Sequence, residues 1–344
     1  MKKTLLYIFP ILALLIIWQL PLIEYGISQA RGQFSILYQA RPIEEVYADP
    51  QVADTVKRRI RLIQEIKQYA HDSVGLVATS NYESFYDQGG KPVLWVVSAC
   101  EPFALKNKKW SFPVIGSFSY KGFFDHDRAL ALEEELKASG YDTRVRTAGA
   151  WSTLGFFNDP ILSNMIQRPV GSMTELIIHE LTHGTLFVND SLRFNENLAS
   201  FIGYRGAVDF LTYKYGANSD ELSAYLQAEE DYLQFTQHML NGKNQLDSLY
   251  GSFPDEADSI YKAREKKKMI TSIIDAADTI HFNREDYYGR VFNRYREPEY
   301  FPNNALFMAF NRYRADLTFF EEQYEKAFNH LPDFVAYYRK KYEK

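Results

Sequence analysis

The sequence predicts a mainly helical α+β protein, with a membrane helix at the N-terminus and a small mixed sheet packed on a buried helix that carries two histidines. Three observations indicate this class. An apolar run at residues 5–23 is long enough for a helix that crosses a bilayer. Short stretches of β-type residues between residues 92 and 147 are bounded by glycine and proline. After residue 216, apolar residues recur at helical spacing over two long stretches.

The composition indicates a folded body and excludes several classes of protein. Hydrophobic residues make up 46% of the chain and aromatic residues 16%, which excludes a disordered protein. The net charge of -5 gives no basic surface for nucleic acid. The single cysteine, Cys100, excludes an internal disulfide, and its distance from any Cys/His cluster argues against a catalytic thiol. We expect residues 1–24 to form an anchor and residues 25–344 one body, made of helices and sheet (25–170), two site helices (171–215), and a helical hairpin with C-terminal helices (216–344).

The N-terminal segment has the pattern of a membrane anchor. At 1.5 Å per residue its apolar run is about 28 Å long, which just spans a hydrocarbon core. Lys2 and Lys3 precede the run, and positive residues favour a cytoplasmic N-terminus with export of the rest. A cleaved signal peptide is the alternative, with Ser28-Gln29-Ala30 as a weak cleavage site. Because the run is longer than the core of a signal peptide, we predict a single-pass anchor in the cell membrane, with the body in the periplasm or outside the cell.

Between the anchor and residue 170, the pattern predicts helices first and strands afterwards. Residues 24 to about 70 are expected to be helical, because apolar residues recur there at near-helical spacing. The elements expected next are strands at 92–100 and 112–120, a helix at 129–139 ended by Gly140, and a strand at 143–147 that residues 151–154 continue.

The segment from Glu175 to His183 contains His179-Glu180-x-x-His183. On a helix the two histidines lie roughly 40° apart, so both imidazoles can reach one metal ion. Glu180 lies roughly 60° beyond His183, where its carboxylate can take a proton from a water at the metal. A Ser172-x-x-Glu175 capping box is expected to start this helix. The alternative is a core helix with two hydrogen-bonded histidines, but a buried carboxylate beside them is costly without a metal.

A catalytic zinc ion needs a third protein ligand and an open fourth position. Glu196 is the best placed candidate, because Asn195 is a natural cap for a second helix that Glu196 would open. Turn-forming residues at 188–193 allow this helix to fold back beside the first. The alternative is that Glu196 is only a first-turn acid favoured by the helix dipole.

The last third of the chain is predicted to be helical. Residues 220–250 and 255–280 are expected to pair as an antiparallel hairpin, because Gly251-Ser252-Phe253-Pro254 separates two long helical patterns. The cluster Arg264 to Lys268 is most simply a solvated face, and the alternative is binding of anionic lipid. Residues 303–342 form a helical, aromatic stretch.

Taken together, these motifs make the chain resemble a bacterial family of zinc aminopeptidases of the gluzincin type. The matching stretches after the N-terminus are 25–26, 41–45, 110–116, 120–125, 150–155, 159–160, the His179 segment, 195–196, 199–200, 303–305 and Tyr313. The resemblance implies a zincin-like fold, and a zinc ion held by His179, His183 and Glu196 with Glu180 as the base.

The same resemblance implies where a peptide would bind. In a gluzincin a sheet edge lines the cleft, so the segment around Trp151, Ser152 and Thr153 would offer backbone groups to an extended substrate. An ordinary strand-to-loop junction explains that segment equally well. Tyr313 is a candidate to stabilise the oxyanion. Asn303 and Asn304 are candidates to bind a substrate backbone or amine, and for each of these residues a structural role is the alternative.

Three functions are compatible with the sequence. The first is a membrane-anchored zinc peptidase that hydrolyses peptide bonds and is an aminopeptidase by resemblance. The second is a non-catalytic envelope binding or assembly protein with a structural zinc site. The third is a zinc hydrolase of a non-peptide amide or ester. An open coordination position and an intact Glu180 favour an enzyme, because structural zinc sites are normally closed by four protein ligands.

Overall fold

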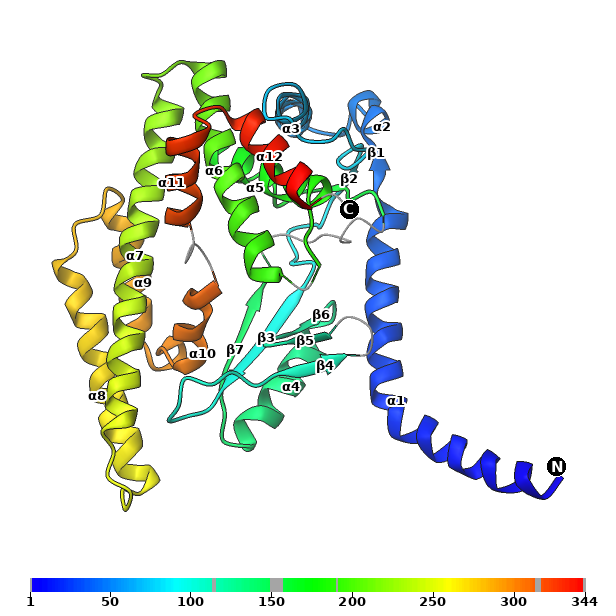
Figure 1. Ribbon diagram of the computed structural model, residues 1–344, viewed down its shortest axis with the longest axis vertical. Coiled ribbons are helices and arrows are strands. Elements are labelled where there is room, and N and C mark those ends of the chain that lie inside the picture. Colours follow the sequence, from blue (N-terminus) through cyan, green and yellow to red (C-terminus); the bar gives the residue numbers. More distant parts are fainter. Residues whose placement is uncertain (1, 113–115, 149–156, 190, 313–316, 343–344) are drawn as a thin grey trace.

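The computed structural model describes residues 2–112, 116–148, 157–189, 191–312 and 317–342 (Figure 1). The chain is α+β and mainly helical, as predicted. The helices are α1 (Lys2–Gln39), α2 (Ile43–Ala48), α3 (Asp54–Asp72), α4 (His126–Ala138), α5 (Val170–Thr185), α6 (Leu192–Tyr215), α7 (Asp220–Gly251), α8 (Ser259–Ala276), α9 (Glu285–Arg296), α10 (Asn304–Phe307), α11 (Leu317–Ala327) and α12 (Leu331–Tyr342), with 3-10 turns η1 (Ala277–Thr279), η2 (Pro298–Tyr300) and η3 (Met308–Arg312). The strands are β1 (Arg41–Pro42), β2 (Ser84–Tyr86), β3 (Trp95–Cys100), β4 (Trp110–Phe112), β5 (Gly116–Phe118), β6 (Lys121–Phe123), β7 (Asp142–Thr147) and β8 (Ile161–Leu162).

Helix α1 is longer than the predicted 1–24 segment, and its second half is part of the folded body. Tyr25 and Gln29 both donate hydrogen bonds to the carbonyl of Gly122, at 2.9 and 3.1 Å. The side chains of most of the predicted membrane span lie outside the described residues. None of the helices in the described part of the chain is long and apolar enough to cross a membrane. Residues 24 to about 70 are mainly helical, as predicted, and the chain turns through β1 and divides there into the end of α1, α2 and α3.

The strands form three small sheets rather than one. A mixed sheet has the order β1-β2-β8, an antiparallel sheet the order β6-β3-β7, and β4 and β5 form a hairpin. The single strand predicted at 112–120 is wrong, since Phe112 and Phe118 belong to the two arms of that hairpin and Tyr120 precedes β6. Gly116, the first residue of β5, has a φ of +86°, a conformation that glycine adopts without steric cost. The predicted continuation at 151–154 lies outside the described residues.

The two faces of the β6-β3-β7 sheet have different partners. Val97, Ala99 and Val145 pack against α4, which begins at Asp125, whose carboxylate caps the backbone amides of the first turn. The opposite face carries Val96 and Ser98 of β3, which pair with Arg146 and Arg144 of β7. This face is turned toward α7 and η3. This alternation places the sheet between α4 and the C-terminal helices (Figure 1).

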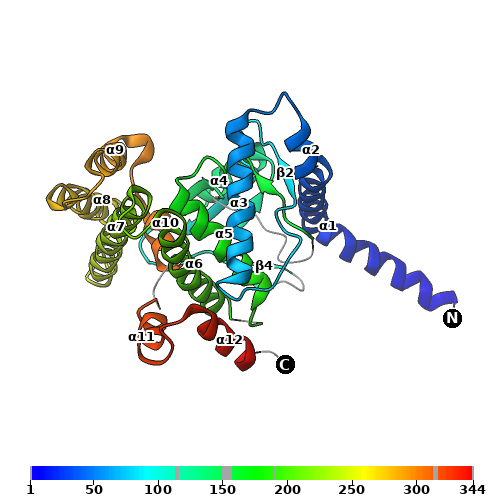
Figure 2. The same ribbon diagram turned by 90° about the horizontal axis from the view of Figure 1, so that it is seen from above.

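Two hydrophobic cores organise the helices. The larger one joins α3, α5, α6, α11 and α12, and α3 crosses over α5 when the molecule is seen from above (Figure 2). The smaller one lies within the predicted hairpin of α7 and α8 and includes α9 and α10. The helical stretch predicted at 303–342 is confirmed in the described residues, where it consists of α10, η3, α11 and α12.

Candidate metal centre

Helix α5 carries the two histidines in the middle of the larger core. Met173, Ile177 and Ile178 are fully buried, so the apolar face of the helix fixes its orientation. The predicted capping box is wrong, because α5 begins earlier, after Pro169, without a side-chain cap. Glu175 instead accepts a hydrogen bond of 3.0 Å from the hydroxyl of Tyr225 on α7.

Helix α6 folds back beside α5, as predicted from the turn residues between them. It begins at Leu192, and Asn195 has a different task from the expected cap. Its side chain donates to the carbonyl of Val188 at 2.8 Å and accepts from the amide of the same residue at 2.9 Å. This pair of hydrogen bonds ties the connection to the first turn of α6 and sets the position of the neighbouring Glu196.

Two glycines on α6 let the helices approach closely. A Cβ atom on Gly203 would lie 2.9 Å from the carbonyl oxygen of Glu175 and 3.2 Å from Cβ of His179. A Cβ on Gly206 would lie 2.8 Å from Cδ1 of Ile178. Only residues without a side chain fit this contact, so the spacing of α5 and α6 depends on them. The sequence contains this signal, which is a pair of glycines three apart inside a helical pattern.

The three predicted ligands converge between the two helices. Nε2 of His183 lies 3.2 Å from Nε2 of His179. The carboxylate oxygens of Glu196 lie 3.6 Å from Nε2 of His179 and 3.5 Å from Nε2 of His183. Ligands at zinc distances of 2.0–2.1 Å in a tetrahedron are separated by about 3.4 Å. The donor set and its spacing therefore fit one zinc-sized ion.

The pKa shifts of His179, His183 and Glu196 indicate a proton that a histidine shares with the Glu196 carboxylate. Burial opposes protonation of His179, but its hydrogen bond to Glu196 and the nearby carboxylates outweigh this and raise its pKa. Burial and the charge of His179 lower the pKa of His183 to about 4. For Glu196, burial is outweighed by the two histidines, so its pKa is lowered and it stays ionised.

Glu180 is placed beside this cluster with a different environment. Burial is the main cause that raises the pKa of Glu180, and the like charges of Glu196 and Asp159 also raise it. The charge of His179 has the opposite effect and lowers it. Tyr82 lies close enough for Glu180 and Asp159 to add to the effect of burial, which raises the pKa of its phenol well above its usual range. No motif in the sequence pointed to Tyr82. It is buried with a φ of +67°, a strained conformation for a bulky residue, and such strain is concentrated at functional sites.

The Nδ1 atoms of His179 and His183 differ in their hydrogen-bond partners. Nδ1 of His179 lies 3.5 Å from the hydroxyl of Ser200 on α6, a long contact of the kind that orients a ligand imidazole. Nδ1 of His183 is buried without a hydrogen-bond partner among the residues that the structure describes.

Among the described residues, the other predicted site residues, Asn303 and Asn304, do not join this cluster. Trp151, Ser152, Thr153 and Tyr313 lie outside the described residues. Asn303 and Asn304 instead hold the short helix α10 against the sheet. The Asn303 amide donates to the carbonyl of Thr143 at 2.8 Å. The Asn304 amide donates to the carbonyls of Glu101 and Pro102, at 2.9 and 3.1 Å, and its oxygen accepts from Tyr250 at 2.7 Å.

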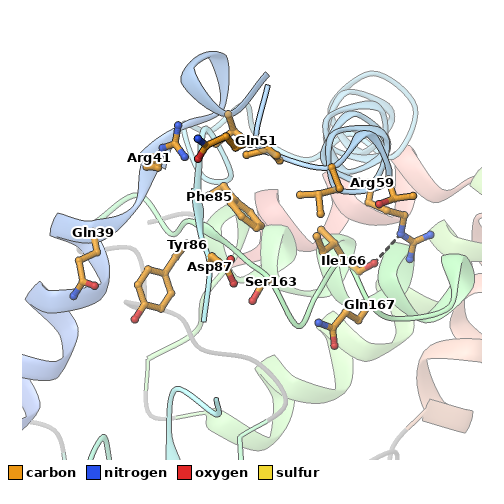
Figure 3. A pocket seen from close by; sticks show the side chains of 15 residues that line it. Gln39, Arg41, Gln51, Arg59, Phe85, Tyr86, Asp87, Ser163, Ile166 and Gln167 are labelled. Atoms are coloured by element: carbon orange, nitrogen blue, oxygen red, sulfur yellow. Dashed lines mark hydrogen bonds between the residues drawn. The ribbon is translucent and has the colours of Figure 1, made fainter. Parts of the chain in front are cut away.

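A separate pocket of about 540 Å³ lies over β2, between α3 and the loop after β8 (Figure 3). Phe85 and Ile166 form part of its wall, and Arg59 donates to the carbonyl of Ile166 at 2.8 Å. None of the residues that line it is one of the three candidate ligands, so this pocket is distinct from the metal centre.

Comparison with known proteins gives one match. A family model described as "Putative aminopeptidase" matches residues 24–343. No curated protein and no solved structure matches the chain.

Proposed function

The chain belongs to the "putative aminopeptidase" family, and on that premise we propose that it is a zinc peptidase whose metal is held by His179, His183 and Glu196. The observation that carries the proposal is the convergence of these three donors at 3.2 to 3.6 Å from one another, beside a buried glutamate. The donor set, two imidazoles and a carboxylate, is one used by catalytic zinc in peptidases, and it leaves a position open. A zincin-like, gluzincin-type arrangement is part of this proposal.

The residues of the chain then have distinct tasks. A zinc ion at this site supplies a Lewis acid that polarises the peptide carbonyl and acidifies a water molecule. Glu180 would accept a proton from the attacking water and return it to the leaving amine. Because burial raises the pKa of Glu180, its carboxylate is a stronger base than an exposed glutamate and is better matched to work near neutral pH. Glu196 stays ionised, as a ligand must.

Replacing Glu180 by Gln tests this division of tasks. The variant removes the base and keeps the ligands, so we expect about one zinc per chain and a loss of turnover of roughly 10² to 10⁴-fold. The measurement is hydrolysis of a peptide library by the full chain, with free and acetylated N-termini compared. An aminopeptidase should cleave only the free set. Glu285→Gln, which changes an exposed acid on α9, is the matched control and should keep full activity.

Equal turnover by Glu180→Gln and the wild type would reject Glu180 as the base. Bound zinc without turnover of any peptide by the wild type would favour a binding protein or a hydrolase of another bond.

We further propose that the N-terminal segment anchors the enzyme in the cell membrane, with the body on the outer side. Support comes from the apolar run at residues 5–23 behind Lys2 and Lys3. A reporter that is active only after export, fused behind Lys344, should then be active. An inactive export reporter, together with an active cytoplasmic one at the same position, would reject this location.

A further inference from the structure

A pocket of about 270 Å³ lies on the face of the β6-β3-β7 sheet that points away from α4. Its floor is formed by alternate residues of the two paired strands, Val96 and Ser98 of β3 and Arg144 and Arg146 of β7. Arg146 lies across from Val96 and Arg144 across from Ser98 in the antiparallel register. Residues two apart on a strand share a face, so both arginines belong to the same side of the sheet.

Aromatic residues of the C-terminal helices form the rest of the wall. They are Tyr232 and Phe235 of α7, Tyr295 of α9 and Phe310 of η3, and Tyr120 comes from the turn before β6. The pocket therefore combines two guanidinium groups with tyrosine hydroxyls above an apolar wall. Burial is the first cause that raises the pKa of Tyr295, so it stays protonated near neutral pH. This composition is that of a pocket for an anion carried on a partly apolar molecule.

The two arginines have no carboxylate partner among the described residues, although both are partly buried. Burial lowers the pKa of Arg144, and the charge of Arg146 acts in the same direction, but a guanidinium stays charged. Asp231, a buried acid on α7, is engaged elsewhere, since it accepts hydrogen bonds from Arg284 and from the backbone amide of Asn283. A buried arginine is normally paired, so two neighbouring ones without an acid are an unsatisfied anion site.

Helix α7 runs from the helix of the metal centre to this pocket. Tyr225 on α7 contacts α5 through its hydrogen bond to Glu175, which lies one turn before His179. Tyr232 lies seven residues further along the same helix, which is about 10 Å. An extended peptide covers about 3.3 Å per residue, so about three residues cover this length of α7.

We propose that Arg144 and Arg146 bind a carboxylate of the substrate, which gives the enzyme a preference for peptides with an acidic group a few residues from the cleaved bond. This inference rests on the proposed peptidase function. A guanidinium binds a carboxylate with two parallel hydrogen bonds, which makes arginine more selective for it than lysine. The carboxylate can be a side chain or the C-terminus of the peptide, and the experiment separates these two.

The test measures binding rather than turnover, with the zinc-loaded full chain carrying Glu180→Gln. The probes are alanine hexapeptide amides with a free amine and one Glu at each position in turn, the same set with Gln, and an all-alanine hexapeptide with a free C-terminal carboxylate. We expect one acidic peptide to bind at least about tenfold more tightly than its neutral counterpart. Arg144→Gln and Arg146→Gln should each remove that difference, and Arg290→Gln, an exposed arginine on α9, should keep it.

A second readout distinguishes binding from a structural role. If Arg144 is held in the pocket for a ligand, Arg144→Gln removes an unpaired buried charge, and the melting temperature of the free protein should stay equal or rise. A fall of more than about 5 °C would assign it a structural role and overturn the proposal. A Glu-to-Gln difference that persists in both arginine variants, or is absent at every position and at the C-terminus, would also overturn it. Failure of the peptidase proposal is a separate result, because binding of these peptides does not need turnover.

Discussion

His179 and His183 are identical residue types four positions apart, yet their surroundings give them opposite properties. His179 is held by Glu196 and has a raised pKa, whereas burial and the charge of His179 lower the pKa of His183 to about 4. The proton that a metal would displace from the proposed site is therefore carried by His179. Glu180 differs from both, because its role depends on a carboxylate that burial makes more basic.

Zinc affinity should depend on pH through His179. Above its raised pKa, His179 is neutral and the affinity is independent of its protonation. As pH falls through that pKa, a proton competes for Nε2, and the affinity should fall about tenfold per pH unit. His183 adds a second proton only near its pKa of about 4. Competition with a chromophoric chelator between pH 5 and 8 measures this slope, after correction for the chelator. A flat profile across the range would contradict the assignment.

At the scale of elements, the pairing of α5 with α6 determines the site. The sequence predicted the histidine helix, the return of the second helix and the convergence of His179, His183 and Glu196, because helical spacing and turn residues are local signals. The start of α5 and the role of Asn195 were predicted wrongly, and the division of 24–70 among three helices was not predicted. These features depend on contacts between distant residues, such as Tyr225 with Glu175, which local patterns do not report.

The close contact of the two helices predicts the effect of a single methyl group. Gly203→Ala would place Cβ 2.9 Å from the backbone oxygen of Glu175, which cannot move without shifting α5. We expect a loss of about 1–3 kcal/mol of unfolding free energy and weaker zinc binding, because Glu196 moves with α6. Urea denaturation and chelator competition measure the two effects.

Gly184→Ala is the matched control, since nothing lies within 4 Å of a Cβ at that position on α5. It should be neutral or stabilising by up to about 1 kcal/mol. Equal stability of Gly203→Ala and the wild type would show that the contact does not set the helix spacing.

At the scale of the whole molecule, the smaller core is joined to the β6-β3-β7 sheet. Asp142, the first residue of β7, forms an ion pair with Lys266 of α8 and accepts a hydrogen bond from the backbone amide of Asn304 at 2.7 Å. This contact holds the helical arm over the face that carries the arginine pocket. The alternation of residues along the strand could be predicted from the sequence. The residues that cover it could not, because Tyr232, Phe235 and Tyr295 come from α7 and α9, far along the chain.

The zinc content of the purified full chain tests the metal centre most directly. After loading with zinc and desalting, the wild type should retain about one zinc per chain, and His183→Ala less than about a tenth of that. His281→Ala, which removes an exposed histidine, should retain the same amount as the wild type. No retained zinc in the wild type, or one zinc per chain in His183→Ala, would contradict a site built from His179, His183 and Glu196.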